Sequence, residues 1–242
     1  MQERNIVVET EDGKMDAFIV HPDTPGPFAT VVMYQNVSGL SDSMRGMARR
    51  VAAEGYYCAV PDLYYRLGKI VIDADSEDSR MQEIRKVAIQ SLENRAVMAD
   101  TRALLDAMAA DPLARPRPGG VVGYCMGGRY SLLAAAHFPD VFKACASLFG
   151  TGLMTDAPDS PHRLVPRIQG EVYCGFAEHD SLAPPQVVAQ IEAGLRQGAA
   201  TCVVETHPGT THGYAFPGRP CYQKEAAEKS WQRIFEMFRR QL

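Results

Sequence analysis

A cysteine lies at the centre of a glycine-rich turn in Gly123-Tyr124-Cys125-Met126-Gly127-Gly128. The run Gly119–Val122 before it is apolar and strand-like, and Arg129–Phe138 after it places small and apolar residues at helical spacing. A strand, a sharp turn and a helix are the context of a nucleophile elbow, whose central residue projects from the end of a sheet. The pattern predicts that Cys125 is positioned to attack an electrophile.

A thiol at such a turn has two physical sources of reactivity. The dipole and free N–H groups at the start of the following helix stabilise a thiolate, and a nearby histidine would form an ion pair with it. The alternative is a small buried cysteine that packs like a hydrophobic residue. The residues further along the chain favour the first interpretation.

An acid and then a histidine follow the cysteine in the chain. Strand-like runs at Glu171–Gly175 and Cys202–His207 end shortly before Asp180 and His212. Because the carboxyl ends of parallel strands meet at one edge of a sheet, we expect both side chains to lie near Cys125.

Each partner has competitors. Asp180 is also placed to cap a helix that starts near Pro184. His207 ends a strand, whereas His212 lies at a loop apex before a glycine, which favours His212. Glu178 and His179, beside Asp180, also compete for a catalytic role. The remaining histidines have no motif around them and are interpreted as surface or core residues: His21, His137 and His162.

The chain resembles the dienelactone hydrolase family over nearly its full length. The matching pieces are Asn5–Val20, Gln35–Gly39, Pro61–Arg66, the elbow Gly123–Gly128, Gly175–Asp180 with Pro184, and His212–Tyr214. The resemblance implies that Cys125 is the nucleophile, His212 the general base and acid, and Asp180 the residue that orients His212. It also implies an oxyanion hole formed by the N–H groups of Val37 and Met126.

Two positions depart from the family pattern. Asn36 stands where members that hydrolyse dienelactone carry a glutamate that contacts the resting thiol. Phe216 stands where they carry an arginine, four residues after the catalytic histidine, that binds the substrate carboxylate. Arg219 and Arg66 are possible substitutes at other positions. These departures argue against dienelactone itself as the substrate.

Other residues are candidates for shaping the pocket. Tyr64, Tyr65 and Arg66 follow a strand end on the predicted active edge, and Arg66 is suited either to an anionic group or to a surface ion pair. The candidate substrate contacts are therefore Asn36, Tyr64, Tyr65, Arg66, Phe216 and Arg219. Ser76–Arg95 carries alternating charges, which are typical of a solvated helix face, and a lid is the alternative.

Strands and helices alternate along the chain, which predicts an α/β-hydrolase fold with a mostly parallel sheet flanked by helices, in a single domain spanning residues 1–242. Asp111–Pro118 is proline-rich and is expected to be a rigid loop. The other expected elements are strands at Thr30–Tyr34, Tyr57–Val60 and Ala144–Phe149, and helices at Ser43–Glu54, Glu77–Ala110 and Lys224–Arg239.

Composition is that of an ordinary enzyme. The 242 residues are 46% hydrophobic and carry a net charge of −4 in interspersed acids and bases, so we expect a full core and no nucleic-acid partner. No run of about 18 apolar residues and no signal segment is evident, which predicts a cytoplasmic protein with no membrane partner. The six cysteines are at least 19 positions apart, which excludes zinc-finger and C-x-x-C spacing.

The expected chemistry is acyl transfer to water. Cys125 would attack an ester or lactone to form a thioester, which water then hydrolyses, with no metal or organic cofactor. An acyltransferase that uses the same thioester and a non-catalytic ligand-binding protein of the same fold are the alternatives. The expected partner is a small-molecule ester or lactone, and the expected state is a monomer or small homo-oligomer.

Overall fold

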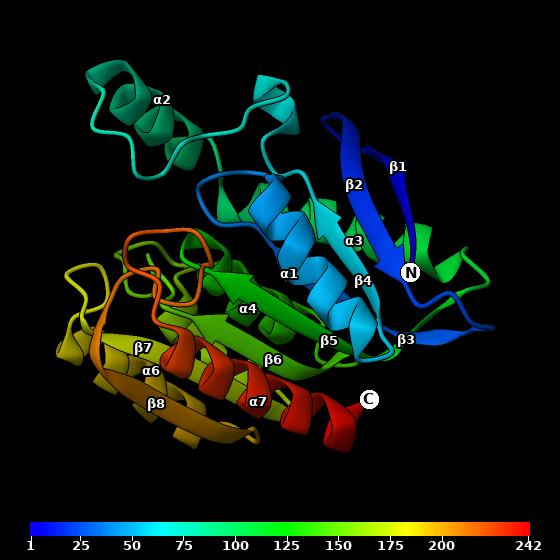
Figure 1. The fold of residues 1–242 in the computed structure, drawn as a ribbon. Helices are drawn as coiled ribbons and strands as arrows, with labels where there is room; N and C mark the ends of the chain where they lie inside the picture. Colours follow the sequence, from blue (N-terminus) through cyan, green and yellow to red (C-terminus); the bar gives the residue numbers. More distant parts are fainter.

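The computed structural model describes residues 1–242 and arranges eight strands in one sheet, in the order β1-β2-β4-β3-β5-β6-β7-β8 (Figure 1). The pairs β1–β2 and β2–β4 are antiparallel, and all other neighbours are parallel. The expectation of a mostly parallel sheet is confirmed. The strands are β1 Gln2–Thr10, β2 Gly13–His21, β3 Phe28–Tyr34, β4 Tyr57–Pro61, β5 Ala114–Tyr124, β6 Phe142–Leu148, β7 Glu171–His179 and β8 Thr201–Thr211.

Helices cover both faces of this sheet. Helices α1 and α7 pack on one face, and α3, α4 and α6 pack on the other (Figure 1). The helices are α1 Asp42–Ala53, α2 Ser79–Gln90, α3 Asn94–Ala109, α4 Met126–His137, α5 Pro161–Leu164, α6 Pro185–Gln197 and α7 Lys224–Gln241, with short 3₁₀ turns η1 Tyr65–Leu67 and η2 Val165–Arg167. No helix has the length and apolar character needed to cross a bilayer.

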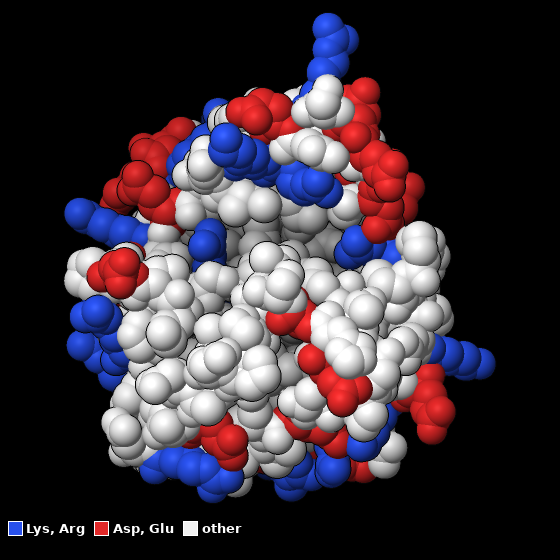
Figure 2. Space-filling model, turned by 90° about the vertical axis from the view of Figure 1, so that its left-hand side faces the viewer, with Lys and Arg blue, Asp and Glu red and all other residues white.

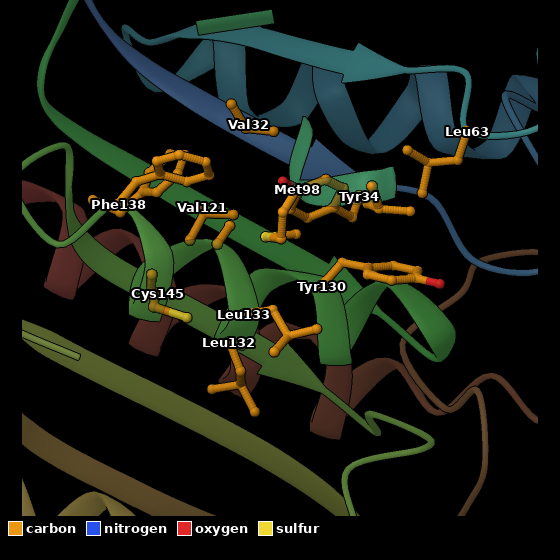
Figure 3. Packing of buried hydrophobic residues seen from close by; sticks show 14 of the residues in the cluster. Val32, Tyr34, Leu63, Met98, Val121, Tyr130, Leu132, Leu133, Phe138 and Cys145 are labelled. Carbon is orange, nitrogen blue, oxygen red and sulfur yellow. The ribbon is translucent and has the colours of Figure 1, made fainter. Parts of the chain in front are cut away.

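The central strands are apolar because both of their faces are covered. In β3, Val32 and Tyr34 point to the core shared with α3 and α4, and Val31 and Met33 point to the core under α1 and α7. Figure 3 shows the first of these cores, where side chains of β3, β5 and α4 pack together, Tyr34 and Tyr130 among them. A rigid central sheet therefore supports the ends of β3, β5 and β6.

Three boundaries differ from the sequence-based expectation. The helical region expected at Glu77–Ala110 is broken between α2 and α3, and α2 buries only Ala88. The expected loop Asp111–Pro118 contains the start of β5, whose prolines fall where the register with β3 shifts, so the ladder loses little from their missing N–H groups. Strand β8 continues past Pro208 to Thr211, which an edge strand tolerates.

Candidate active site

The turn between β5 and α4 holds Cys125 in a backbone conformation that side chains rarely adopt, with φ 57° and ψ −122°. Two glycines make this turn sterically possible. A Cβ at Gly123 would collide with the carbonyl oxygen of Gly127. A Cβ at Gly127 would lie only 2.5 Å from the carbonyl oxygen of Gln35. The partly exposed thiol is thereby placed at the carboxyl edge of the sheet.

An acid and a histidine lie at the ends of the next strands along that edge. Asp180 follows β7, and its fully buried Oδ2 accepts a hydrogen bond from His212 Nδ1, which follows β8, at 2.8 Å. Its Oδ1 accepts from the Leu182 N–H at 2.9 Å. The N-cap of α6 is Pro184, so Asp180 does not cap that helix, and its carboxylate is paired with His212.

The second ring nitrogen of His212, Nε2, is buried and has no hydrogen-bond partner. It lies close enough to Cys125 for the charge of each group to alter the pKa of the other. Desolvation opposes the charged form of both groups, but the Asp180 hydrogen bond and the Cys125 thiolate raise the pKa of His212 to about 10. The interaction with His212 likewise lowers the pKa of Cys125, with smaller contributions from the Met126 N–H and the Thr151 side chain. The arrangement favours a thiolate–imidazolium pair.

The two backbone N–H groups predicted as oxyanion donors, those of Val37 and Met126, make no hydrogen bond to another backbone group. Met126 is the first residue of α4, so its N–H has no partner within the helix and interacts with Cys125. The N–H of Val37 donates to no acceptor in the protein. The Tyr64 hydroxyl donates to the Val37 carbonyl at 3.1 Å and holds this loop in place. The positions expected for oxyanion donors therefore carry free or sulfur-facing N–H groups.

Three of the candidate substrate contacts line one cavity beside this site: Asn36, Phe216 and Arg219. Phe216 is buried and packs edge-on against Tyr124, with ring centroids 5.2 Å apart. Arg219 forms an ion pair with Asp75 at 2.6 Å.

Tyr65 and Arg66 follow the carboxyl end of β4, but neither lines the cavity beside the triad, so their prediction as substrate contacts was wrong. Turn η1 directs both side chains toward the β1–β2 turn and α3. There Tyr65 donates to Asp100 at 2.8 Å, and Arg66 pairs with Asp12 at 2.7 Å and with Asp100 at 2.8 Å. Arg66 is therefore neutralised by two carboxylates, and of its two possible roles the ion pair is observed.

The competing residues do not approach Cys125. Glu178 and His179 are exposed, and the Glu178 carboxylate accepts from the Gly209 N–H at 2.7 Å. His207 is buried, with its Nε2 hydrogen-bonded to the Tyr173 hydroxyl at 3.1 Å and the Ser230 hydroxyl at 3.2 Å. Burial lowers the pKa of His207, which favours its neutral form.

One contact of Cys125 was missed from sequence. Thr151 donates its backbone N–H to the Cys125 carbonyl at 3.0 Å, and its side chain contributes to the lowered pKa of the thiol. Its position just beyond β6, at the carboxyl end of a central strand, was the available signal. No group of three or more His, Cys, Asp and Glu side chains is arranged to hold a metal ion.

Figure 2 looks onto the carboxyl edge of the sheet and shows a recess whose walls are mostly neither acidic nor basic. A family model described as the dienelactone hydrolase family matches residues 15–242. The chain belongs to the dienelactone hydrolase family. This family assignment makes the protein a hydrolase and agrees with the resemblance seen in its motifs.

Relatives of this dienelactone hydrolase family member are similar over most of their length. A candidate carboxymethylenebutenolidase of Synechocystis sp. is 27% identical over 98% of this chain and 96% of its own, and one of Escherichia coli K12 is 28% identical over 96% and 84%. The crystal structure of a candidate dienelactone hydrolase from Klebsiella pneumoniae matches with a TM-score of 0.87 and 25% identity, over 98% of both chains.

Proposed function

We propose that the protein hydrolyses carboxylic esters or lactones through a Cys125–His212–Asp180 triad and a thioester intermediate. The observation that carries this proposal is the 2.8 Å hydrogen bond from His212 Nδ1 to buried Asp180, which leaves an unpartnered Nε2 beside a cysteine in an elbow. Family membership supports the same reaction class.

The reaction begins with attack of the Cys125 thiolate on the substrate carbonyl carbon. Negative charge moves to the carbonyl oxygen, where the N–H groups of Val37 and Met126 stabilise it. When the tetrahedral intermediate collapses, the bond to the alkoxide breaks and His212 gives its Nε2 proton to that oxygen. The acyl group remains on sulfur as a thioester.

Water completes the cycle. Neutral His212 removes a proton from a water molecule, whose oxygen attacks the thioester carbonyl. The carbon–sulfur bond then breaks, which releases a carboxylic acid and restores the thiolate beside a protonated His212. A thiolate leaves a tetrahedral intermediate more readily than an amine does, so esters and lactones are better substrates than amides.

The test is turnover of 4-nitrophenyl acetate by the wild type and by Cys125→Ala. We expect nitrophenolate release beyond one equivalent in the wild type and a loss of at least about 10³-fold in the variant. Mass spectrometry of acid-quenched protein should show an acetyl group on Cys125. Cys202→Ala, which changes a thiol on β8 away from the elbow, is the control. Equal activity of Cys125→Ala, with an intact circular dichroism spectrum, would refute the proposal.

A further inference from the structure

The cavity next to the triad has a mixed polar and apolar lining. It has a volume of about 270 Å³ and is lined by three stretches of chain: the loop at 36–43, the segment at 72–75 that leads into α2, and residues 216–219 after His212. Nine of its twelve lining residues are not hydrophobic, and they include Asn36, Ser38, Ser41 and Ser43. Polar groups converging on one cavity are what orients a ligand in a binding site.

Asn36 is the strongest pointer to a ligand. It is 2% exposed, and its Oδ1 accepts a hydrogen bond from the Ser38 N–H at 3.0 Å. This bond fixes the orientation of the amide and leaves Nδ2, which has no hydrogen-bond partner in the protein, on the cavity side. The two N–H groups of this amide are free to donate to a ligand in the cavity.

Three serine hydroxyls in the lining add hydrogen-bond acceptors to the donors of the Asn36 amide. Neither Ser38 nor Ser43 makes a side-chain hydrogen bond within the protein, and Ser41 accepts only from the Met44 N–H, at 3.4 Å. Each hydroxyl can donate and accept at once. The cavity therefore presents a mixed set of donors and acceptors, which suits hydroxyl groups.

The net charge of the cavity decides between a charged and a neutral ligand. Arg219 is the basic residue of the lining, and its guanidinium is held by Asp75 through contacts of 2.6–3.2 Å. A second acid, Asp73, also lines the cavity, so the lining holds one arginine and two aspartates. An anionic group would meet an already neutralised arginine and an additional carboxylate, whereas a neutral hydroxylated group meets no such repulsion.

The position of the cavity assigns it to one part of the substrate. It lies between the Asn36–Ser43 loop, which contains Val37, and residues 216–219, which follow His212 by a few positions. Because His212 must reach the leaving oxygen to protonate it, the alcohol portion of an ester extends to this side. We propose that the cavity binds the alcohol portion of the substrate, and that this portion carries hydroxyl groups, as in esters of polyols.

This inference rests on the proposed ester hydrolysis. Its test compares 1-monobutyrin with n-propyl butyrate, which share the acyl chain and a three-carbon alcohol and differ by two hydroxyl groups. We expect kcat/KM of the wild type to be about tenfold higher for monobutyrin, as one to two net neutral hydrogen bonds give. The double variant Ser38→Ala/Ser43→Ala should lower this ratio at least about threefold, while Ser79→Ala, at the exposed start of α2, should keep it.

The outcomes separate the two proposals. Equal kcat/KM for the two esters in the wild type, or an unchanged ratio in the double variant, would overturn the cavity assignment while leaving the thioester chemistry in place. Failure of the wild type to cleave either ester, with no acyl group found on Cys125, would overturn both. Circular dichroism and an intact rate of Cys125 alkylation establish that the double variant is folded.

Discussion

Cys125 and His212 change each other's pKa. The hydrogen bond of Asp180 to Nδ1 raises the pKa of His212 further. The pKa of the thiol is lowered and that of His212 is raised to about 10, so the ion pair persists between these two values. Below the lowered thiol pKa the sulfur is protonated, and above about 10 the imidazolium is lost. Both shifts favour the thiolate–imidazolium pair over the neutral thiol and imidazole.

This coupling predicts the pH dependence of alkylation. In the wild type, the rate of Cys125 modification by iodoacetamide should rise with pH over a lower range than that of an ordinary thiol, because the pKa of this thiol is lowered. In His212→Ala the rate should be lower at pH 7 and rise with pH toward the ordinary thiol range near about 8.5. Mass spectrometry of the Cys125 peptide separates this thiol from the other five. The same pH profile in both proteins would show that His212 does not act on the sulfur.

The buried Asp180 carboxylate should be needed for full esterase activity. Asp180→Asn removes the charge that stabilises the imidazolium but keeps the side-chain volume, so kcat/KM for 4-nitrophenyl acetate should fall by at least about 100-fold. Glu178→Gln is the matched control, because Glu178 is exposed and its carboxylate contacts only the chain around Gly209 and His179. A similar loss in both variants would argue for a general structural effect.

Local motifs explain which site residues could be found from sequence. Cys125, Asp180 and His212 each follow a strand, so their convergence depends on the parallel sheet alone. Arg66 could not be placed in this way, because its direction is set by η1 and by a carboxylate on α3, 34 positions away. Asn36 was noted for its departure from the family, but its free amide is visible only once Ser38 is seen to occupy Oδ1.

At the scale of elements, the crossing of β5 and α4 depends on glycine. Backbone atoms of Gly127 and Gly128 fill the space that a side chain at Gly123 would need, and backbone cannot move aside as a flexible side chain can. The elbow is therefore a rigid joint. The connection between α2 and α3 escaped the sequence pattern because a short turn interrupts the helical spacing there without proline or glycine.

This joint predicts the effect of a single added methyl group. Gly123→Ala should lower the free energy of unfolding in urea by about 2–3 kcal/mol or more, because the clash is with backbone. Gly46→Ala is the control: Gly46 lies inside α1 with nothing within 4 Å of its Cβ position, and alanine there should raise the free energy of unfolding by about 0.5–1 kcal/mol. Equal effects of the two substitutions would contradict the steric account.

At the scale of the whole molecule, α7 closes the core on one face of the sheet. Trp231, the only tryptophan, is 3% exposed, stacks on Phe235 with centroids 5.0 Å apart, and carries the Arg50 guanidinium 4.8 Å above its ring. Arg50 also pairs with Glu228. These contacts hold α7 against α1 on the same face of the sheet.

Truncation of this side chain should destabilise the whole fold. Trp231→Ala is expected to lower the free energy of unfolding by about 3–5 kcal/mol, measured by circular dichroism in urea because the variant lacks tryptophan fluorescence. Val71→Ala is the control, since Val71 is 66% exposed and should change the value by no more than about 0.5 kcal/mol. A change below about 1 kcal/mol for Trp231→Ala would mean that α7 adds little to global stability.

Helix α2 buries a single residue, Ala88, and begins shortly after the segment at 72–75 that lines the cavity beside the triad. So short a helix with so little tertiary contact opens at small cost, independently of the sheet. Its amide protons should exchange with deuterium far sooner than those of β3. Insertions or new side chains in α2 should therefore leave the sheet, and with it the positions of Cys125, Asp180 and His212, almost unchanged.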